Sequence, residues 1–198
     1  MKKIFPLLFI VFLLSCSSGE IQERRWLENY NESLLGFPPM DWLHFPFDFS
    51  YFSNKKIIVY PQEASKVHLM AGLILDTRVN DLFFKDYYNI LVNQDFKKTS
   101  MLNDSIFIIG DTIEDFSSVR FTYPLPDFSD CYDEFGFSSN KLSGKEEVFI
   151  IEYKQGEFID SEHLVKNLNT PDGWSHGMSR GIAIDSLRKR IVYWLVYW

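Results

Sequence analysis

The segment Ile191-Val192-Tyr193-Trp194-Leu195-Val196-Tyr197-Trp198 decides the fold, because every one of its residues is apolar or aromatic. Successive side chains of a strand point to opposite faces of a sheet, so both faces of this segment would be apolar. Such a strand belongs inside a sheet that is covered on both sides. We therefore expect a central strand here, preceded by a turn at residues 186–190.

Further strands are expected upstream of this segment, where short runs of β-branched and aromatic residues occur. The runs lie at residues 56–60, 105–109, 119–123, 147–153 and 181–185. The glycine within Lys154-Gln155-Gly156-Glu157 predicts a hairpin turn into Phe158-Ile159. Residues 124–145 are rich in Pro, Gly, Ser, Asn and acidic residues, which predicts a long loop.

Helical patterns lie mainly in the first half of the chain. Residues 20–35 carry apolar side chains at helical spacing and end before Gly36 and two prolines. Residues 62–75 and 79–92 also fit helical stripes, although Leu73-Ile74-Leu75 could equally begin a strand. The aromatic stretch at residues 37–52 alternates with period two from Phe45 to Tyr51, which predicts an extended segment.

These expectations define an α+β fold, with helices mainly in the first half and a mostly antiparallel sheet in the second half. The chain has 198 residues, of which 46% are hydrophobic and 17% aromatic, so it can bury a sizeable core. We find no internal repeat and no dividing linker. A single globular domain is therefore expected over residues 21–198.

The net charge of -7 argues against a nucleic-acid partner, because phosphate binding needs a basic surface. Two cysteines cannot form a disulfide framework.

The first residues have the pattern of an export signal. Met1-Lys2-Lys3 is a basic start, and residues 4–14 are uncharged and mostly apolar. As a helix, those residues would be about 16 Å long, roughly half the hydrocarbon thickness of a bilayer. They are too short for an ordinary membrane-spanning helix.

The end of that pattern, Leu13-Leu14-Ser15-Cys16, resembles the lipobox of bacterial lipoproteins. The resemblance implies a signal peptide at residues 1–15, an acylated Cys16 (diacylglycerol with a further acyl chain such as palmitate), and a short tether at residues 16–20. It covers none of the globular domain. In Gram-negative lipoproteins Asp after the cysteine favours inner-membrane retention, so Ser17 favours the outer membrane. Two or more acyl chains anchor a protein stably, and the side of the membrane that the domain faces stays open.

The densest polar stretch is the loop Asp172–Gly181. It contains Gly177-Met178-Ser179-Arg180-Gly181, a match to the G-x-S-x-G nucleophile motif. A hydrolase would use His176 and Ser179 with Asp172 or Asp185. However, all four histidines precede Ser179, and the flanking segments do not form the strand–turn–helix that the motif requires.

The same loop offers a ligand-binding alternative. Trp174 could stack on a ligand, His176 is of the residue type that can titrate near neutral pH, and Arg180 could hold a carboxylate or phosphate. The structural alternative is that the tryptophan fills the core and that the arginine pairs with an acidic residue.

Other polar and aromatic clusters carry weaker indications. The rings at residues 37–52 could stack on a glycan beside Asp41 and Asp48, but Phe is mainly a core residue. Neither Asp41, His44 and Asp48 nor the acidic residues around Cys131 have metal-binding spacing. We therefore expect no metal and no cofactor, and the role of Cys131 stays open.

Together these features predict a lipid-anchored envelope lipoprotein whose domain is a non-enzymatic binding or interaction module. The anchor, the acidic net charge and the lack of a coherent catalytic set favour this interpretation. The partners would be the membrane, through the lipid on Cys16, and a protein or glycan ligand. The alternatives are an envelope hydrolase that uses the Asp172–Gly181 loop and a structural tether between envelope layers.

Overall fold

A computed structural model describes residues 21–60, 70–100, 105–109, 123–126, 128, 146–159, 164 and 170–198. The chain divides into two compact units, Met1–Pro39 and Met40–Trp198. The predictions for residues 1–20, including Cys16, and for Cys131 and its acidic neighbours lie outside the described residues.

The described part of the first unit is a helix over residues 21–35, as predicted. The rings of Trp26 and Tyr30, one helical turn apart, stack with centroids 5.4 Å apart. The helix ends at Gly36, and the Phe37 amide closes the last turn by donating to the Leu34 carbonyl at 3.1 Å.

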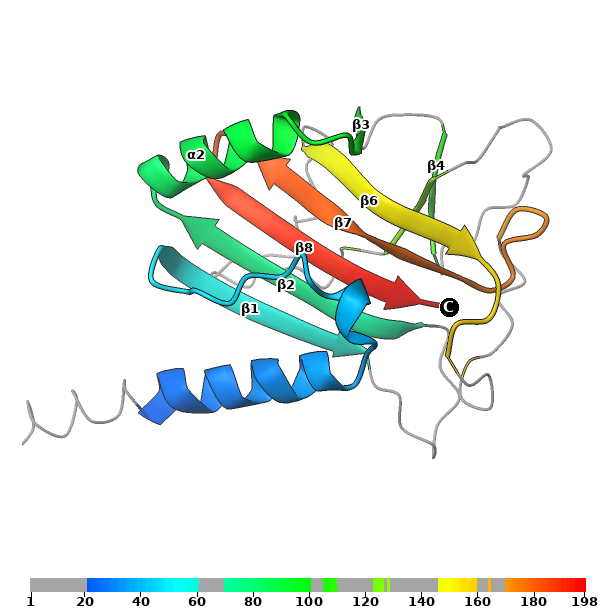
Figure 1. Ribbon diagram of the computed structural model, residues 1–198, viewed down its shortest axis with the longest axis horizontal. Coiled ribbons are helices and arrows are strands. Elements are labelled where there is room, and N and C mark those ends of the chain that lie inside the picture. Colours follow the sequence, from blue (N-terminus) through cyan, green and yellow to red (C-terminus); the bar gives the residue numbers. More distant parts are fainter. Residues whose placement is uncertain are drawn as a thin grey trace, which may run out of the picture. The chain divides into compact units, whose positions relative to one another are not determined.

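The second unit is built on a six-stranded, fully antiparallel sheet (Figure 1). Its strands, in spatial order, are β1 (Phe52–Tyr60), β2 (Ala71–Val79), β8 (Arg190–Tyr197), β7 (Gly177–Asp185), β6 (Glu147–Gln155) and β3 (Lys97–Ser100). A separate parallel pair joins β4 (Ile106–Ile108) and β5 (Tyr123–Leu125). The short 3-10 helix η1 (Pro39–Asp41) and the helix α2 (Asp81–Val92) complete the described elements.

Strand β8 lies in the interior of the sheet, between β2 and β7, which confirms the central strand expected from its sequence. Its residues are all buried. We call the side that carries Val192, Trp194, Val196 and Trp198 the tryptophan face, and the side that carries Tyr193, Leu195 and Tyr197 the tyrosine face. The α+β class predicted for the chain is confirmed, and so is the turn after Asp185.

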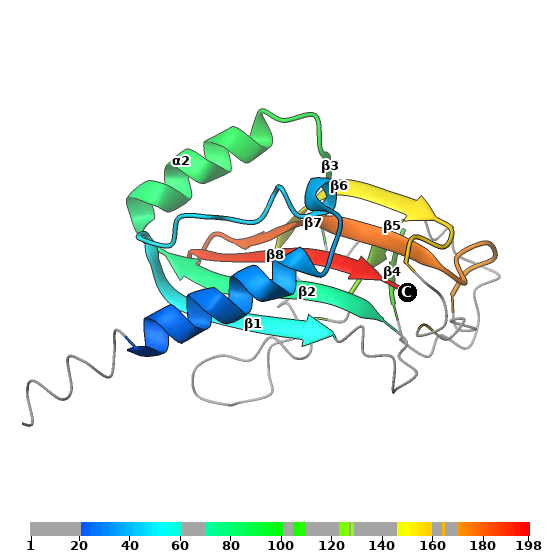
Figure 2. The same ribbon diagram turned by 60° about the horizontal axis from the view of Figure 1, so that its bottom comes forward.

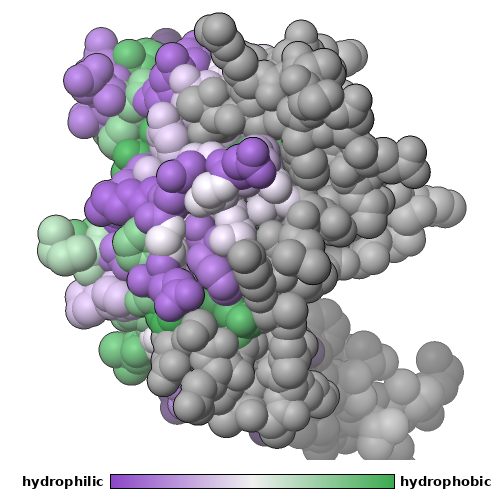
Figure 3. Space-filling model, turned by 90° about the vertical axis from the view of Figure 1, so that its right-hand side faces the viewer, coloured by the Kyte–Doolittle hydropathy of each residue, from purple (hydrophilic) through white to green (hydrophobic). Residues whose placement is uncertain are grey.

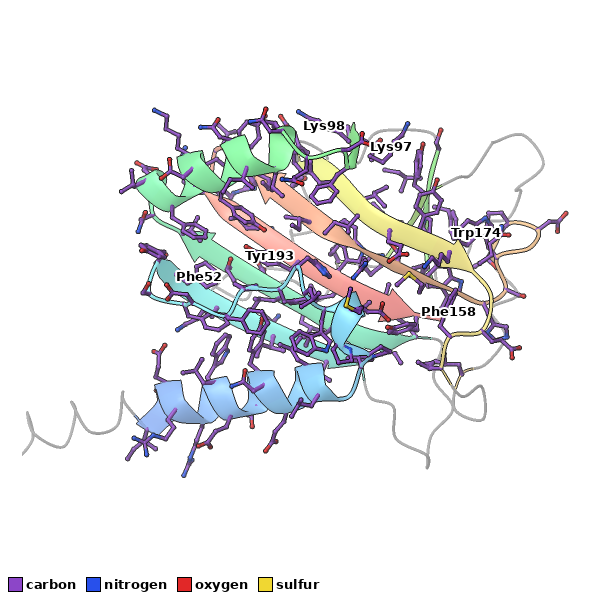
Figure 4. The ribbon with its side chains drawn as sticks, in the orientation of Figure 1. Phe52, Lys97, Lys98, Phe158, Trp174 and Tyr193 are labelled. Atoms are coloured by element: carbon purple, nitrogen blue, oxygen red, sulfur yellow. The ribbon has the colours of Figure 1, made fainter. Side chains whose placement is uncertain are left out.

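Each face of the sheet has its own cover. On the tryptophan face, residues of β4, β5 and their neighbours pack against the sheet, including Phe107, Leu125 and Phe128. On the tyrosine face, α2 lies across the strands (Figure 2). Tyr193 projects from β8 toward α2 and the segment before β1, with its ring centroid 6.1 Å from that of Tyr87 and 6.0 Å from that of Phe45 (Figure 4).

Helix α2 confirms the helix predicted at residues 79–92, with a later start at Asp81. Asn80 caps it, because its side-chain oxygen accepts a hydrogen bond from the Phe83 amide at 2.9 Å. Phe84 and Leu91 are its buried residues.

The helix predicted at residues 62–75 is wrong where the structure describes it, because residues 71–75 belong to β2. Leu73, Ile74 and Leu75 are buried, and they pair with β1 on one side and β8 on the other. A run buried on both faces shows neither helical nor alternating periodicity, so its pattern does not separate the two structures.

Two further local predictions are wrong. The hairpin from Lys154 into Phe158-Ile159 does not form, because β6 continues to Gln155 and pairs with β7 and β3. The stretch at residues 37–51 is a series of turns rather than an extended segment. Its rings do not alternate between core and solvent: Phe45 is buried, Phe49 is half-buried, and Phe47 and Tyr51 are exposed.

Candidate functional site

The structure uses Trp174 in the core rather than at the surface. Its side chain is 7% exposed and packs on the tryptophan face. Its ring stacks on that of Trp198, with centroids 5.9 Å apart, and its carbonyl accepts a hydrogen bond from the Trp198 indole at 2.8 Å. Figure 4 shows it beside the end of β6. Its ring faces are covered, so the core interpretation of Trp174 is the one that the geometry supports.

Ser179 lies in the middle of β7 and is 0% exposed. Its hydroxyl donates to the Pro124 carbonyl at 2.7 Å and accepts from the Trp194 indole at 3.1 Å. Both hydrogen bonds are internal to the fold. A nucleophile elbow instead exposes its serine on a sharp turn between a strand and a helix, so the geometry lends no support to the hydrolase alternative.

The G-x-S-x-G motif has a packing explanation. Gly177, Ser179 and Gly181 occupy alternate positions of β7 and therefore share the tryptophan face. A Cβ atom at Gly177 would come within 2.5 Å of the Trp198 ring, and one at Gly181 within 2.5 Å of the Trp194 ring. The small residues of the motif thus leave room for the two indoles of the neighbouring strand.

The remaining candidates of the loop do not come together. His176 places its Nδ1 3.3 Å from the Trp198 carbonyl and its Nε2 4.0 Å from the Glu157 carboxylate. Arg180 follows Ser179 by one residue and therefore lies on the tyrosine face, opposite Trp174. Trp174, His176 and Arg180 therefore form no common ligand surface.

The proposed acidic partners of Ser179 are also separated from it. Asp172 is exposed in a turn. Asp185 ends β7 six positions beyond Ser179, and its carboxylate accepts hydrogen bonds from the amides of Leu187 and Arg188. Asp185 thus serves the β7–β8 turn.

A second candidate site emerges at residues 40–47, which we call the 40–47 loop. Polar groups on its inner side bind the sheet. The Tyr197 hydroxyl lies 2.5 Å from a carboxylate oxygen of Asp41, and His44 Nε2 lies 2.9 Å from the Trp194 carbonyl. Arg180 donates from its guanidinium to the Met40 carbonyl. These contacts fix the loop on strands β7 and β8.

The outer side of the same loop is apolar. Met40, Leu43 and Phe47 are 69%, 54% and 63% exposed, respectively. Trp42 is half-buried and packs edge-on against Phe47, with centroids 5.7 Å apart. The loop contains only two residues that ionise near neutral pH or below, Asp41 and His44, and both face the sheet. The loop therefore presents an uncharged apolar surface on a fixed backbone.

Arg180 links the 40–47 loop to a charged group on the sheet. It pairs with Glu152 of β6 at 2.7 Å, and Glu152 also contacts Lys154. The hydrogen bond from Lys154, with the nearby Arg180 charge, lowers the pKa of the Glu152 carboxyl. Burial, reinforced by Asp41, raises the pKa of Tyr197, so its hydroxyl stays protonated and donates to the Asp41 carboxylate.

His44 is half-buried beside Arg180 and is held neutral. Burial is the main cause that lowers its pKa to about 4, and the Arg180 charge adds to it. The neutral ring with a proton on Nε2 donates to the Trp194 carbonyl.

We expect the stability of the protein to fall with acidification because of His44. The pKa of this histidine is 6.5 in the unfolded chain and about 4 in the folded chain. Between these two pH values the unfolded chain therefore binds a proton that the folded chain does not, and acidification favours unfolding. The loss should reach at most about 2 kcal/mol between pH 7 and pH 5. Denaturant unfolding at each pH would measure it, and His44→Gln should remove this part of the slope while keeping a donor for the Trp194 carbonyl. An unchanged slope in His44→Gln would contradict the assignment.

Comparisons with known proteins identify no relative: no family model, curated protein or solved structure matches this chain. Among the described residues, no helix has the length and hydrophobicity to cross a membrane, and no three metal-ligating side chains cluster.

Sequence reasoning did not find the 40–47 loop as a unit. It identified Asp41 and His44 as polar residues within an aromatic stretch, which is the only signal that this segment offers. Their partners in β8 lie about 150 residues further along the chain. Only the folded structure shows that these polar groups face inward while the apolar ones face outward.

Proposed function

We propose that this protein is a lipid-anchored lipoprotein of the bacterial envelope whose globular part is a non-enzymatic binding module. Its lipid would be carried by Cys16, and its contact surface would be the 40–47 loop. The observation that carries the binding role is the exposure of Met40, Leu43 and Phe47 on a loop whose inner side is bound to the sheet.

The exposed apolar side chains of this loop are suited to recognition. Several large apolar side chains exposed on one short loop are a feature of interaction sites. A backbone that is already fixed loses less conformational freedom on binding than a flexible one, which favours affinity. Seen from the right-hand side of Figure 1, the described surface mixes hydrophilic and hydrophobic residues (Figure 3).

The anchor is tested by replacing Cys16. Cells that express the Cys16→Ala variant are expected to lose incorporation of labelled palmitate into the protein, because the acylated thiol is gone. Wild-type protein should fractionate with membranes, and protease treatment of intact cells would then report which way the domain faces. Equal labelling of the variant and the wild type would contradict the lipoprotein assignment.

The binding role is tested in the same cells with a photoreactive amino acid at Leu43. The matched control is Leu187, which is 83% exposed in the β7–β8 turn. We expect many adducts from position 43 and few from position 187, because only the 40–47 loop would be held against a partner. If exposure alone determined the yield, the two positions would give equal numbers of adducts. Equal yields, or no adduct at position 43, would contradict a binding role for the 40–47 loop.

A further inference from the structure

We propose that the 40–47 loop docks on the lipid surface that holds the anchor, with Met40, Leu43 and Phe47 entering the interface of the bilayer. This inference rests on the proposed function, because it needs the lipid on Cys16. It deepens that function by naming zwitterionic phospholipid as the partner of the loop.

The length of chain between the anchor and the loop supports this partner. Residues 21–35 form a helix, which spans about 22 Å. Even if every other residue between Cys16 and Met40 were fully extended, the chain would place Met40 at most about 58 Å from the anchored cysteine. The tether therefore keeps the loop near the bilayer, which raises its local concentration there.

The chemistry of the outer side of the loop fits the interface of a bilayer. Transfer of methionine, leucine and phenylalanine side chains out of water lowers the free energy. The half-buried Trp42 is of a residue type that is enriched at the headgroup level of membranes. Asp41 and His44 face the sheet and would not have to be moved into lipid. Docking of the 40–47 loop would therefore bury apolar surface without removing a charge of the loop from water, and the exposed Asp48 that follows Phe47 would stay in the headgroup region.

The net charge of the protein indicates the class of lipid. The full chain carries -7, and the loss of Lys2 and Lys3 with the signal peptide would make this -9, which opposes a strongly anionic surface. The outer side of the 40–47 loop offers no lysine or arginine to attract such a surface. The expected partner is therefore a bilayer rich in zwitterionic headgroups, and the attraction is hydrophobic rather than electrostatic.

The test places a fluorophore at the loop of the full lipidated protein. NBD is attached to Leu43→Cys or, as the control, to Leu187→Cys, each in a Cys131→Ser background; the thiol of an acylated Cys16 is blocked. The protein is reconstituted into vesicles of phosphatidylethanolamine and phosphatidylcholine, some of which carries a doxyl quencher in its acyl chain. We expect at least about a twofold loss of fluorescence at position 43 and little change at position 187.

A second variant separates docking from mere proximity. Phe47→Asp should reduce the quenching at position 43 to the level of the control, whereas Leu187→Asp should leave it unchanged. Phe47 is exposed, so its replacement leaves the core intact. Quenching at position 43 that survives Phe47→Asp would overturn the proposal.

The remaining outcomes are also decisive. If the protein floats with the vesicles but position 43 is not quenched, the anchor exists and the docking proposal fails. If it does not float, the lipoprotein assignment fails, and this inference fails with it. Photoadducts from position 43 that contain only protein and no phospholipid would assign the loop to a protein partner and overturn the lipid assignment.

Discussion

Replacing Asp76 with alanine is expected to lower the free energy of unfolding by about 3–5 kcal/mol. Asp76 of β2 and Arg190 of β8 are both buried on the tryptophan face. The Arg190 guanidinium donates two parallel hydrogen bonds to the Asp76 carboxylate, at 2.7 and 2.8 Å. The variant would leave the guanidinium buried without this carboxylate, and denaturant unfolding would measure the loss.

A second variant tests whether the loss comes from the unpaired guanidinium or from lost packing. A double variant, Asp76→Leu with Arg190→Met, removes both charges and fills most of the space with apolar atoms. It should be more stable than Asp76→Ala, because no buried charge loses its partner. A double variant less stable than the single one would contradict the assignment of the loss to the buried guanidinium.

Replacing Gly181 with alanine is expected to cost about 3 kcal/mol, at the upper end of the range for overpacked cores. The new Cβ atom would come within 2.4 Å of the Phe149 carbonyl oxygen and 2.5 Å of the Trp194 ring. Either β6 and β7 must separate or the indole must leave its position. Where a methyl group fits, replacing glycine with alanine stabilises a protein, because it reduces the conformational entropy of the unfolded chain. At Gly181 the substitution should instead destabilise the protein.

Two controls make this prediction specific. Gly36→Ala introduces the same methyl group, but that group would meet only the Ser33 carbonyl at 3.4 Å, so its effect should be small. In a double-mutant cycle with Trp194→Phe, the two losses should be less than additive, because the smaller ring relieves part of the clash. Full additivity would show that the indole contributes nothing to the cost of Gly181→Ala.

The parts of the fold that could be predicted from the sequence are those whose pattern has one explanation. Residues 191–198 are apolar at every position, and only an internal strand buries both sides of such a segment. Residues 71–75 have a similar run, but Val67, Met70 and Ile74 also fit a helical stripe. Residues 71–75 form a strand because they pair with β1 and β8. Since β8 is distant in sequence, the local pattern could not show this pairing.

The candidate site was less predictable for the same physical reason. Glycine and serine at alternate positions suit both a nucleophile elbow and a strand that must accommodate two indoles. The choice between these interpretations depends on Trp194 and Trp198, which belong to the neighbouring strand. Likewise, period two at residues 45–51 predicted an extended segment, whereas contacts with β7 and β8 hold the 40–47 loop in turns.

The interior position of β8 bears on how an exported chain would cross a membrane. β2 pairs with β8, and the buried ion pair between them joins residues 114 positions apart. Until β8 emerges from the ribosome, β2 lacks its inner neighbour and the sheet cannot close, because contacts of long sequence separation form late. A chain from which β8 has not yet emerged would thus stay unfolded, which is the state that a secretion channel passes. If the protein is exported as we propose, its sheet would assemble after translocation.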